Sequence, residues 1–123
     1  RSDVAFAQSV IETGYFAFPV GGQVAGADNN FAGIGACDSC SHGWTFPDAR
    51  TGVSAQIQLL DAYASTTPVA TPLIGKVSVA GCCRTWAALT GVWATNPNYG
   101  YEVLSIYRQM VEWALPRRLA TGL

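Results

Sequence analysis

The stretch AFAQSVIETGYF, residues 5–16, decides how the fold begins because it joins a helical pattern to a helix stop. Apolar side chains recur along it at helical spacing, and Gly14 supplies the left-handed residue with which many helices end. The pattern extends back to Asp3. We therefore expect a helix from Asp3 that ends at Glu12 or Thr13, with Glu12 in its last turn.

Composition alone leaves two interpretations of Glu12 open. In the first, Glu12 shares a solvent-facing stripe with Ala5, Gln8 and Ser9. In the second, the aromatic residues that follow exclude water, and the negative end of the helix dipole opposes ionisation, so the protonated acid is favoured. A Glu that keeps its proton near neutral pH is what general acid catalysis of glycosidic cleavage requires.

The composition is that of one globular domain over residues 1–123. Half of the residues are hydrophobic, 12% are charged, and the net charge is −1. This balance gives no basic field for a nucleic acid, and no apolar run reaches the roughly 20 residues that span a bilayer. The first residues lack a signal-peptide pattern, which is typical of a mature or trimmed domain. We expect a monomer that binds no nucleic acid and does not insert into membranes.

The rest of the chain predicts further helices separated by loops. One helix is expected over residues 53–65, capped by Asp48 or Thr51, with an apolar stripe of Val53, Ile57, Leu60 and Ala64. A short helix is expected within residues 84–91. The last helix starts after an Asn-Pro pair and stops at Pro116, with one face formed by Val103, Tyr107, Met110 or Val111, and Ala114.

The segment between the first two helices is rich in Gly, Asp, Asn and Ser, with short apolar runs near Ile34 and from Trp44 to Phe46. This pattern predicts loops around a small β-hairpin.

Four cysteines occur as CDSC (Cys37, Cys40) and GCC (Cys82, Cys83). An even number in a small chain favours structural disulfides. Zinc is disfavoured because adjacent cysteines make a poor second ligand pair, and a redox dithiol is disfavoured because no helical pattern follows CDSC. Cys37–Cys40 is the preferred bridge, while the pairing of Cys82 and Cys83 stays open.

Three segments resemble motifs of glycoside hydrolase family 73, bacterial glucosaminidases that hydrolyse peptidoglycan on a lysozyme-like fold. They are residues 5–16, NNFAGIG at 29–35 and WATNPNYGYEVLSIY at 93–107, in the order that the family has them. The resemblance implies an α+β, predominantly helical domain with a small β-hairpin lobe. It also implies cleavage of the β-1,4 glycan strand, most often after N-acetylglucosamine, with no cofactor and no metal. A secreted or wall-associated enzyme is expected, or a phage virion or endolysin component.

The resemblance also implies roles for single residues. Glu12 matches the catalytic acid, and Tyr99 matches a tyrosine that supports it by orienting water or the acetamido group of the substrate. Asn30 and Phe31 match the motif that leads to the small lobe; Asn30 fits a structural hydrogen-bonding role better than a substrate contact. Asn96 stands where the family usually has Asp, which removes a charge but keeps a capping side chain.

A second catalytic acid is not singled out by the sequence. The available aspartates are Asp28, Asp38, Asp48 and Asp61. Asp38 and Asp48 fall in or beside the expected lobe, but Asp48 fits a helix N-cap better, and Asp61 fits a solvated helix position. Should none of them serve, the acetamido group of the substrate can take that role.

Flat side chains are candidates for contacts with sugar rings: Tyr15, Trp44, Phe46 and Trp93. Trp86 and Trp113 fit helical core stripes better. His42 stands alone in a polar loop without a partner for nucleophilic catalysis, and we assign it no catalytic role.

Several alternatives stay open at this level. The same scaffold could act as a muramidase or a lytic transglycosylase, or could be a wall-binding module without turnover. A thiol-redox function is a more distant alternative. Family members commonly have a further helix before the first motif, and its absence here would open the cleft.

Overall fold

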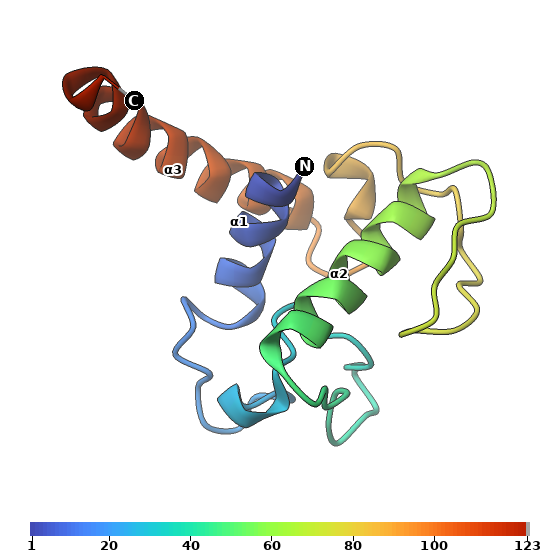
Figure 1. Ribbon diagram of the computed structural model, residues 1–123. Helices are drawn as coiled ribbons and strands as arrows, with labels where there is room; N and C mark the ends of the chain where they lie inside the picture. The colour runs from blue at the N-terminus through green and yellow to red at the C-terminus, as the bar shows by residue number, and fades with distance from the viewer. Residues whose placement is uncertain (123) are drawn as a thin grey trace.

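The computed structural model describes residues 1–122 and is mostly helical in that range (Figure 1). Its elements in chain order are α1 (Ser2–Glu12), the 3-10 turn η1 (Gly26–Asp28), α2 (Ala49–Ala64), the 3-10 turn η2 (Ala87–Leu89) and α3 (Tyr99–Thr121). The expected end of the first helix is confirmed, since α1 stops at Glu12 and Gly14 has φ +57°. Within residues 1–122 no helix is long and apolar enough to cross a membrane.

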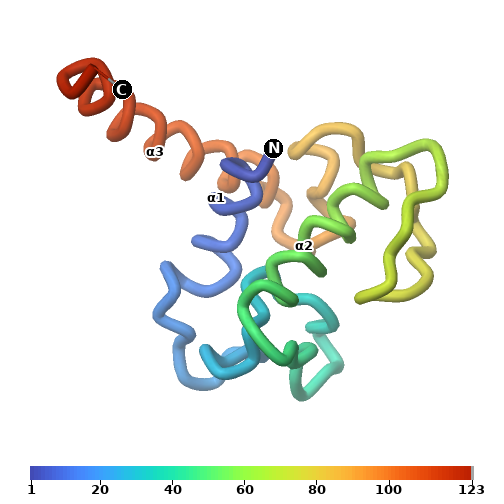
Figure 2. The backbone as a smooth tube through the Cα atoms, viewed as in Figure 1, coloured from blue at the N-terminus to red at the C-terminus, as the bar shows by residue number. Residues whose placement is uncertain are grey.

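Helix α1 lies between α3 and α2 and contacts both (Figures 1 and 2). The first core cluster joins α1 to η2 and the start of α3, and consists of Val4, Ala7, Cys83, Leu89, Tyr99 and Val103. The outer half of α3 projects away from this core (Figure 1). The packing therefore fixes the C-terminal end of α1 beside the first turn of α3.

A second core cluster lies under α2 and consists of Ala32, Ile34, Phe46 and Ala55. It covers the segment where the sequence predicts a β-hairpin lobe. That prediction is wrong for residues 1–122, where the only ladder contact is a single bridge between Thr90 and Ala94.

Side-chain hydrogen bonds, together with isolated backbone hydrogen bonds, take the place of a strand ladder in this segment. The Asn30 amide nitrogen donates to the carbonyls of Ile34, at 2.9 Å, and Trp44, at 2.8 Å. Gly33 and Gly35 have φ +64° and +77°, which interrupts an extended chain. The short apolar runs are thus joined by the buried Asn30 amide and by a backbone hydrogen bond from the Trp44 N–H to the Ile34 carbonyl at 2.8 Å, without forming strands.

The predicted apolar stripe of α2 is confirmed only at Leu60, which packs against the first core cluster. Val53 and Ile57 are exposed, whereas the buried residues of the helix are Gly52, Ala55, Gln56 and Ala62. Small side chains allow the loop below to approach the α2 backbone closely, and Gln56 satisfies its amide by hydrogen bonds. On this face of α2, side chains are buried because the loop packs closely against the helix and because Gln56 finds hydrogen-bond partners, more than because they are hydrophobic.

Helix α3 continues past Pro116 to Thr121, contrary to the predicted stop. A proline inside a helix lacks an N–H and crowds the preceding turn. Here the Arg117 guanidinium donates to the Trp113 carbonyl at 2.6 Å and stacks 3.9 Å over the Trp113 ring. A side chain therefore supplies a hydrogen-bond donor to the disturbed turn. Trp113 itself is exposed, so its predicted place in the core is wrong.

Disulfides link Cys37 to Cys40 and Cys82 to Cys83. The first confirms the preferred bridge, and the second resolves the pairing that the sequence leaves open.

Candidate functional site

Glu12 lies at the junction of three segments: the last turn of α1, the first turn of α3 and the loop around Gly33. The Tyr99 hydroxyl donates a hydrogen bond of 2.5 Å to Glu12 Oε1. The other oxygen, Oε2, lies so close to Gly33 that a Cβ there would be 2.9 Å away. The motif at residues 29–35 therefore places Gly33, and the motif at residues 93–107 places Tyr99, against the carboxyl group of Glu12 in the first motif.

The interpretation of Glu12 as part of a solvent-facing stripe is wrong. Ala5, Gln8 and Ser9, the other members of that stripe, are all buried, and Gln8 is fully so. The stripe faces α2 through hydrogen bonds to Gln56. Glu12 is partly buried at the end of this polar face.

Burial raises the pKa of Glu12 from its ordinary 4.5 to about 7, and the hydrogen bond from Tyr99 opposes that rise in part. Burial and the nearby carboxylate raise the pKa of Tyr99, so the phenol keeps its proton and acts as the donor. At neutral pH a substantial fraction of Glu12 is protonated, as a general acid requires.

A chain of buried side chains leads from Glu12 to α2. The Gln8 amide nitrogen donates to the Tyr99 oxygen at 2.8 Å. The Gln56 amide nitrogen donates to Gln8 Oε1 at 2.8 Å and to the Ala5 carbonyl at 3.0 Å, and Ser9 donates to Gln56 Oε1 at 3.1 Å. All three helices are joined by these bonds.

The NNFAGIG motif has a structural basis. Asn30 is fully buried, donates to two carbonyls and accepts from the Ile34 N–H at 3.0 Å, which confirms its structural hydrogen-bonding interpretation. Phe31 packs its ring near those of Phe16 and Phe18. The Asn30 network holds Gly33 in place against Glu12.

Gly33→Ala is expected to lower activity more than stability. The added Cβ would contact Glu12 Oε2, and φ +64° disfavours any residue with a Cβ by about 1 kcal/mol. Activity should fall roughly tenfold or more, since small misplacements of a catalytic group are costly. Thermal unfolding and glycan cleavage measured side by side check this. A fully active variant would show that the Gly33 contact is unimportant.

The late motif anchors the same loop from the other side. The Trp93 indole N–H donates to the Ala32 carbonyl at 3.1 Å, and its ring packs edge-on against Tyr63. Asn96 accepts from the Asn98 N–H and donates to the Glu102 carboxylate, both at 2.9 Å. An ionised Asp in place of Asn96 could not donate to Glu102, which gives a physical reason for the departure from the family pattern.

The other predicted sugar contacts are placed differently. Trp44 is 44% exposed and lies over Gly35, while Tyr15 is 71% exposed and faces a mostly apolar pocket beside α3. Phe46 is buried in the second core cluster, so its candidacy as a sugar contact is wrong. Trp86 packs against the first cluster as predicted.

Two of the four aspartates considered as a second catalytic acid have definite structural partners. Asp48 is the N-cap of α2, accepting from the Thr51 N–H at 2.7 Å, and these bonds lower its pKa. Asp28 accepts from the Ala25 N–H and from the Thr45 hydroxyl, and lies 3.2 Å from the His42 ring nitrogen. Asp38 and Asp61 are exposed.

Asp48→Asn is expected to leave stability and activity nearly unchanged. Asn caps helices about as well as Asp, so the change in unfolding free energy should stay within about 0.5 kcal/mol. Asp48→Ala should instead cost about 1 kcal/mol. Chemical denaturation and glycan cleavage of both variants provide the check. Loss of activity in Asp48→Asn with an intact fold would show that Asp48 is the second catalytic acid.

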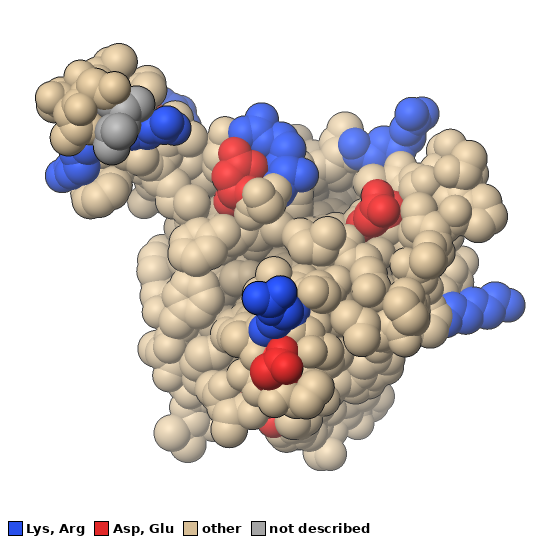
Figure 3. Space-filling model, in the orientation of Figure 1, with Lys and Arg blue, Asp and Glu red and all other residues tan. Residues whose placement is uncertain are grey.

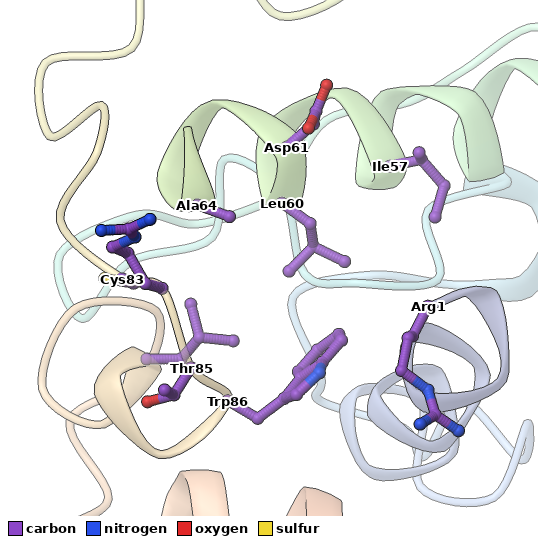
Figure 4. A pocket seen from close by; sticks show the side chains of 10 residues that line it. Arg1, Ile57, Leu60, Asp61, Ala64, Cys83, Thr85 and Trp86 are labelled. Carbon is purple, nitrogen blue, oxygen red and sulfur yellow. The ribbon is translucent and has the colours of Figure 1, made fainter. Parts of the chain in front are cut away.

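A pocket of about 250 Å³ lies between α2, the η2 region and the start of α1 (Figure 4). Asp61, Cys83 and Trp86 line it, and Glu12 does not. No group of three or more His, Cys, Asp or Glu side chains within residues 1–122 is arranged to hold a metal ion.

Three residues of the site were not identified from the sequence. Gln8 and Gly33 both lie in the quoted motifs, and their place there was the signal that could have indicated them. Gln56 had no such signal, because it falls in an ordinary amphipathic pattern.

Residues 1–112 match the family described as mannosyl-glycoprotein endo-beta-N-acetylglucosaminidase. An uncharacterized protein of Borreliella burgdorferi is 32% identical over 114 residues, which are 90% of this chain and 55% of that relative. The chain thus spans about half the length of the relative. No solved structure matches it. The match over most of the chain shows that it belongs to the glucosaminidase family of glycoside hydrolases, family 73.

Proposed function

We propose that the protein hydrolyses the β-1,4 glycan strand of bacterial peptidoglycan with Glu12 as the general acid. The observation that carries the proposal is the partly buried Glu12 carboxyl group, with a pKa of about 7, in contact with Tyr99. Family membership supports a peptidoglycan glycosidase activity in general. The preferred bond is the one that follows N-acetylglucosamine.

In the proposed reaction Glu12 gives its proton to the glycosidic oxygen as the bond to the anomeric carbon breaks. Water then adds to that carbon and gives one proton back to the Glu12 carboxylate, so a new reducing end forms and the acid is restored. Tyr99 is a positioning residue here, because its buried hydroxyl makes both of its hydrogen bonds within the protein.

The charge distribution suits a substrate of low charge density. Lys and Arg side chains are scattered over the face shown in Figure 3, with no continuous basic patch there. Trp93, Trp44, Tyr15 and Phe31 remain proposed substrate contacts, whereas the buried Asn30 and the helix-capping Asp48 are assigned structural roles in place of the substrate contacts that the resemblance implied. A secreted or wall-associated location follows from the substrate.

The test is digestion of purified peptidoglycan, followed by mass spectrometry of the products after borohydride reduction. A reduced N-acetylglucosamine end is expected. A reduced N-acetylmuramic acid end would indicate a muramidase, and an anhydro-muramyl end a lytic transglycosylase. Binding to insoluble peptidoglycan without any new end would indicate a wall-binding module and would overturn the hydrolase proposal.

A further inference from the structure

We propose that Gln56, on α2, is a positioning residue that directs the Tyr99 hydroxyl proton toward Glu12 and thereby selects the carboxyl oxygen that carries the acid proton. The inference rests on the proposed function of Glu12. It assigns a role to a residue that does not touch Glu12 and lies outside the three motifs.

The direction of the hydrogen-bond chain follows from its fixed end. The Ala5 backbone carbonyl can only accept, so the Gln56 atom 3.0 Å from it is the amide nitrogen. The same nitrogen lies 2.8 Å from Gln8, which must present its oxygen there. The Ser9 hydroxyl lies 3.1 Å from the remaining Gln56 oxygen and 3.3 Å from the Ala5 carbonyl, and its single proton goes to the nearer Gln56 oxygen, which completes the pattern.

The orientation of Gln8 then determines that of Tyr99. With its oxygen turned to Gln56, Gln8 directs its amide nitrogen to the Tyr99 oxygen at 2.8 Å. The single hydroxyl proton of Tyr99 is left for Glu12 Oε1, at 2.5 Å. Since Oε1 accepts this bond, the carboxylic proton of Glu12 belongs on Oε2, the oxygen beside Gly33.

The surroundings of Glu12 leave the hydrogen-bond chain through Gln56, Gln8 and Tyr99 as the main influence on where its carboxyl proton lies. Gln8 and Gln56 are almost fully buried, so water does not compete for their amides. Within residues 1–122, Tyr99 is the one titratable group that bonds to Glu12, and Gly33 lies beside the other carboxyl oxygen. The ion pairs of residues 1–122 leave Glu12 out: Arg1–Asp3, Asp28–His42 and Arg108–Glu112.

The decisive variant is Gln56→Glu, which keeps the side-chain shape. In its neutral form the introduced acid has one proton, which the Ala5 carbonyl accepts, so Gln8 must turn its nitrogen toward the acid. Gln8 then offers its oxygen to Tyr99, which donates to Gln8 and leaves Glu12. The midpoint of Glu12 titration, followed by carbon-13 NMR of its carboxyl group, should rise by about 0.5 to 1 pH unit.

A double-mutant cycle with Tyr99→Phe separates this effect from a direct effect of the new acid. Adding Gln56→Glu to Tyr99→Phe should leave the Glu12 midpoint unchanged, because no hydroxyl remains to be turned. Equal shifts in both backgrounds, or no shift in the wild-type background, would overturn the proposal. Gln58→Glu, on the same helix, is the matched control and should give no shift, since its oxygen can still accept from the Leu73 N–H.

A second measurement needs no variant and decides the matter if Gln56→Glu does not fold. Nuclear Overhauser effects between the Gln8 side-chain amide protons and the Tyr99 ring are expected in the wild type. Contacts of those protons with the Gln56 side chain instead would overturn the proposal. These readouts require no substrate. A protein that shows the coupling but releases no reducing ends would contradict the proposed hydrolysis alone.

Discussion

Glu12→Gln is expected to lower the release of reducing ends from peptidoglycan by about 10²- to 10⁴-fold, the range for loss of a general acid. The amide has nearly the same shape and its oxygen can still accept from Tyr99, but it has no acidic proton to give. The measurement is the initial rate of reducing-end formation with equal amounts of folded protein.

The same substitution is expected to stabilise the fold at alkaline pH. Between about pH 4.5 and 7 the folded protein holds a proton that the unfolded chain has lost, so wild-type stability falls as pH rises through this window. Above about pH 7, ionisation of the buried Glu12 carboxyl group costs the folded wild-type protein about 3 kcal/mol, and Glu12→Gln removes this cost. Below about pH 4.5 the two proteins should be equally stable. Denaturation at pH 4 and pH 8 provides the check.

Glu112→Gln is the matched control for both measurements. Glu112 is exposed and pairs with Arg108 at 2.7 Å, a surface ion pair worth less than about 1 kcal/mol. Activity should be unchanged, with no gain in stability at pH 8. If Glu112→Gln impaired cleavage as strongly as Glu12→Gln did, or if Glu12→Gln stayed active, the assignment of the acid would be wrong.

Gly52→Ala is expected to destabilise the protein by about 3 kcal/mol or more, the upper part of the usual range for overpacking. Its Cβ would lie 1.7 Å from the Asn29 carbonyl oxygen, and both atoms belong to backbone segments that cannot rotate away. Alanine favours a helix by only about 1 kcal/mol over glycine, so the clash dominates. The melting temperature should fall by roughly 10 °C.

Gly26→Ala serves as the control for this prediction. The Cβ added there would meet the Phe18 ring at 3.6 Å, an ordinary contact distance. Its melting temperature should change by only a few degrees. Wild-type stability in Gly52→Ala would contradict the close packing of α2 on the turn at Asn29.

The helices were predictable because their signals are local. Gly14 marks the end of α1, and apolar spacing from Val103 onward marks α3. The missing hairpin was not predictable by periodicity, since it depends on a buried Asn30 that bonds to residues 4 and 14 positions away. The extension of α3 past Pro116 was likewise not predictable from the proline alone, which removes one backbone donor, and the Arg117 side chain adds a hydrogen bond to the Trp113 carbonyl in this turn.

The site was predictable in part. The motifs indicated Glu12 and Tyr99, and the structure brings these residues into contact although 87 positions separate them. Gln56 was not indicated, because a buried glutamine on α2 looks like a solvated one until its partners on α1 are known. The spacing of hydrophobic residues predicts which apolar side chains are buried. It does not predict which polar side chains are buried with hydrogen-bond partners.

The most direct measurement of the central claim is a carbon-13 NMR titration of the Glu12 carboxyl group in the wild-type protein. The account predicts a midpoint near pH 7, raised by burial, and a higher midpoint in Tyr99→Phe, where the hydrogen bond that favours ionisation is gone. A wild-type midpoint near 4.5, insensitive to Tyr99→Phe, would show a solvated carboxylate and contradict the account.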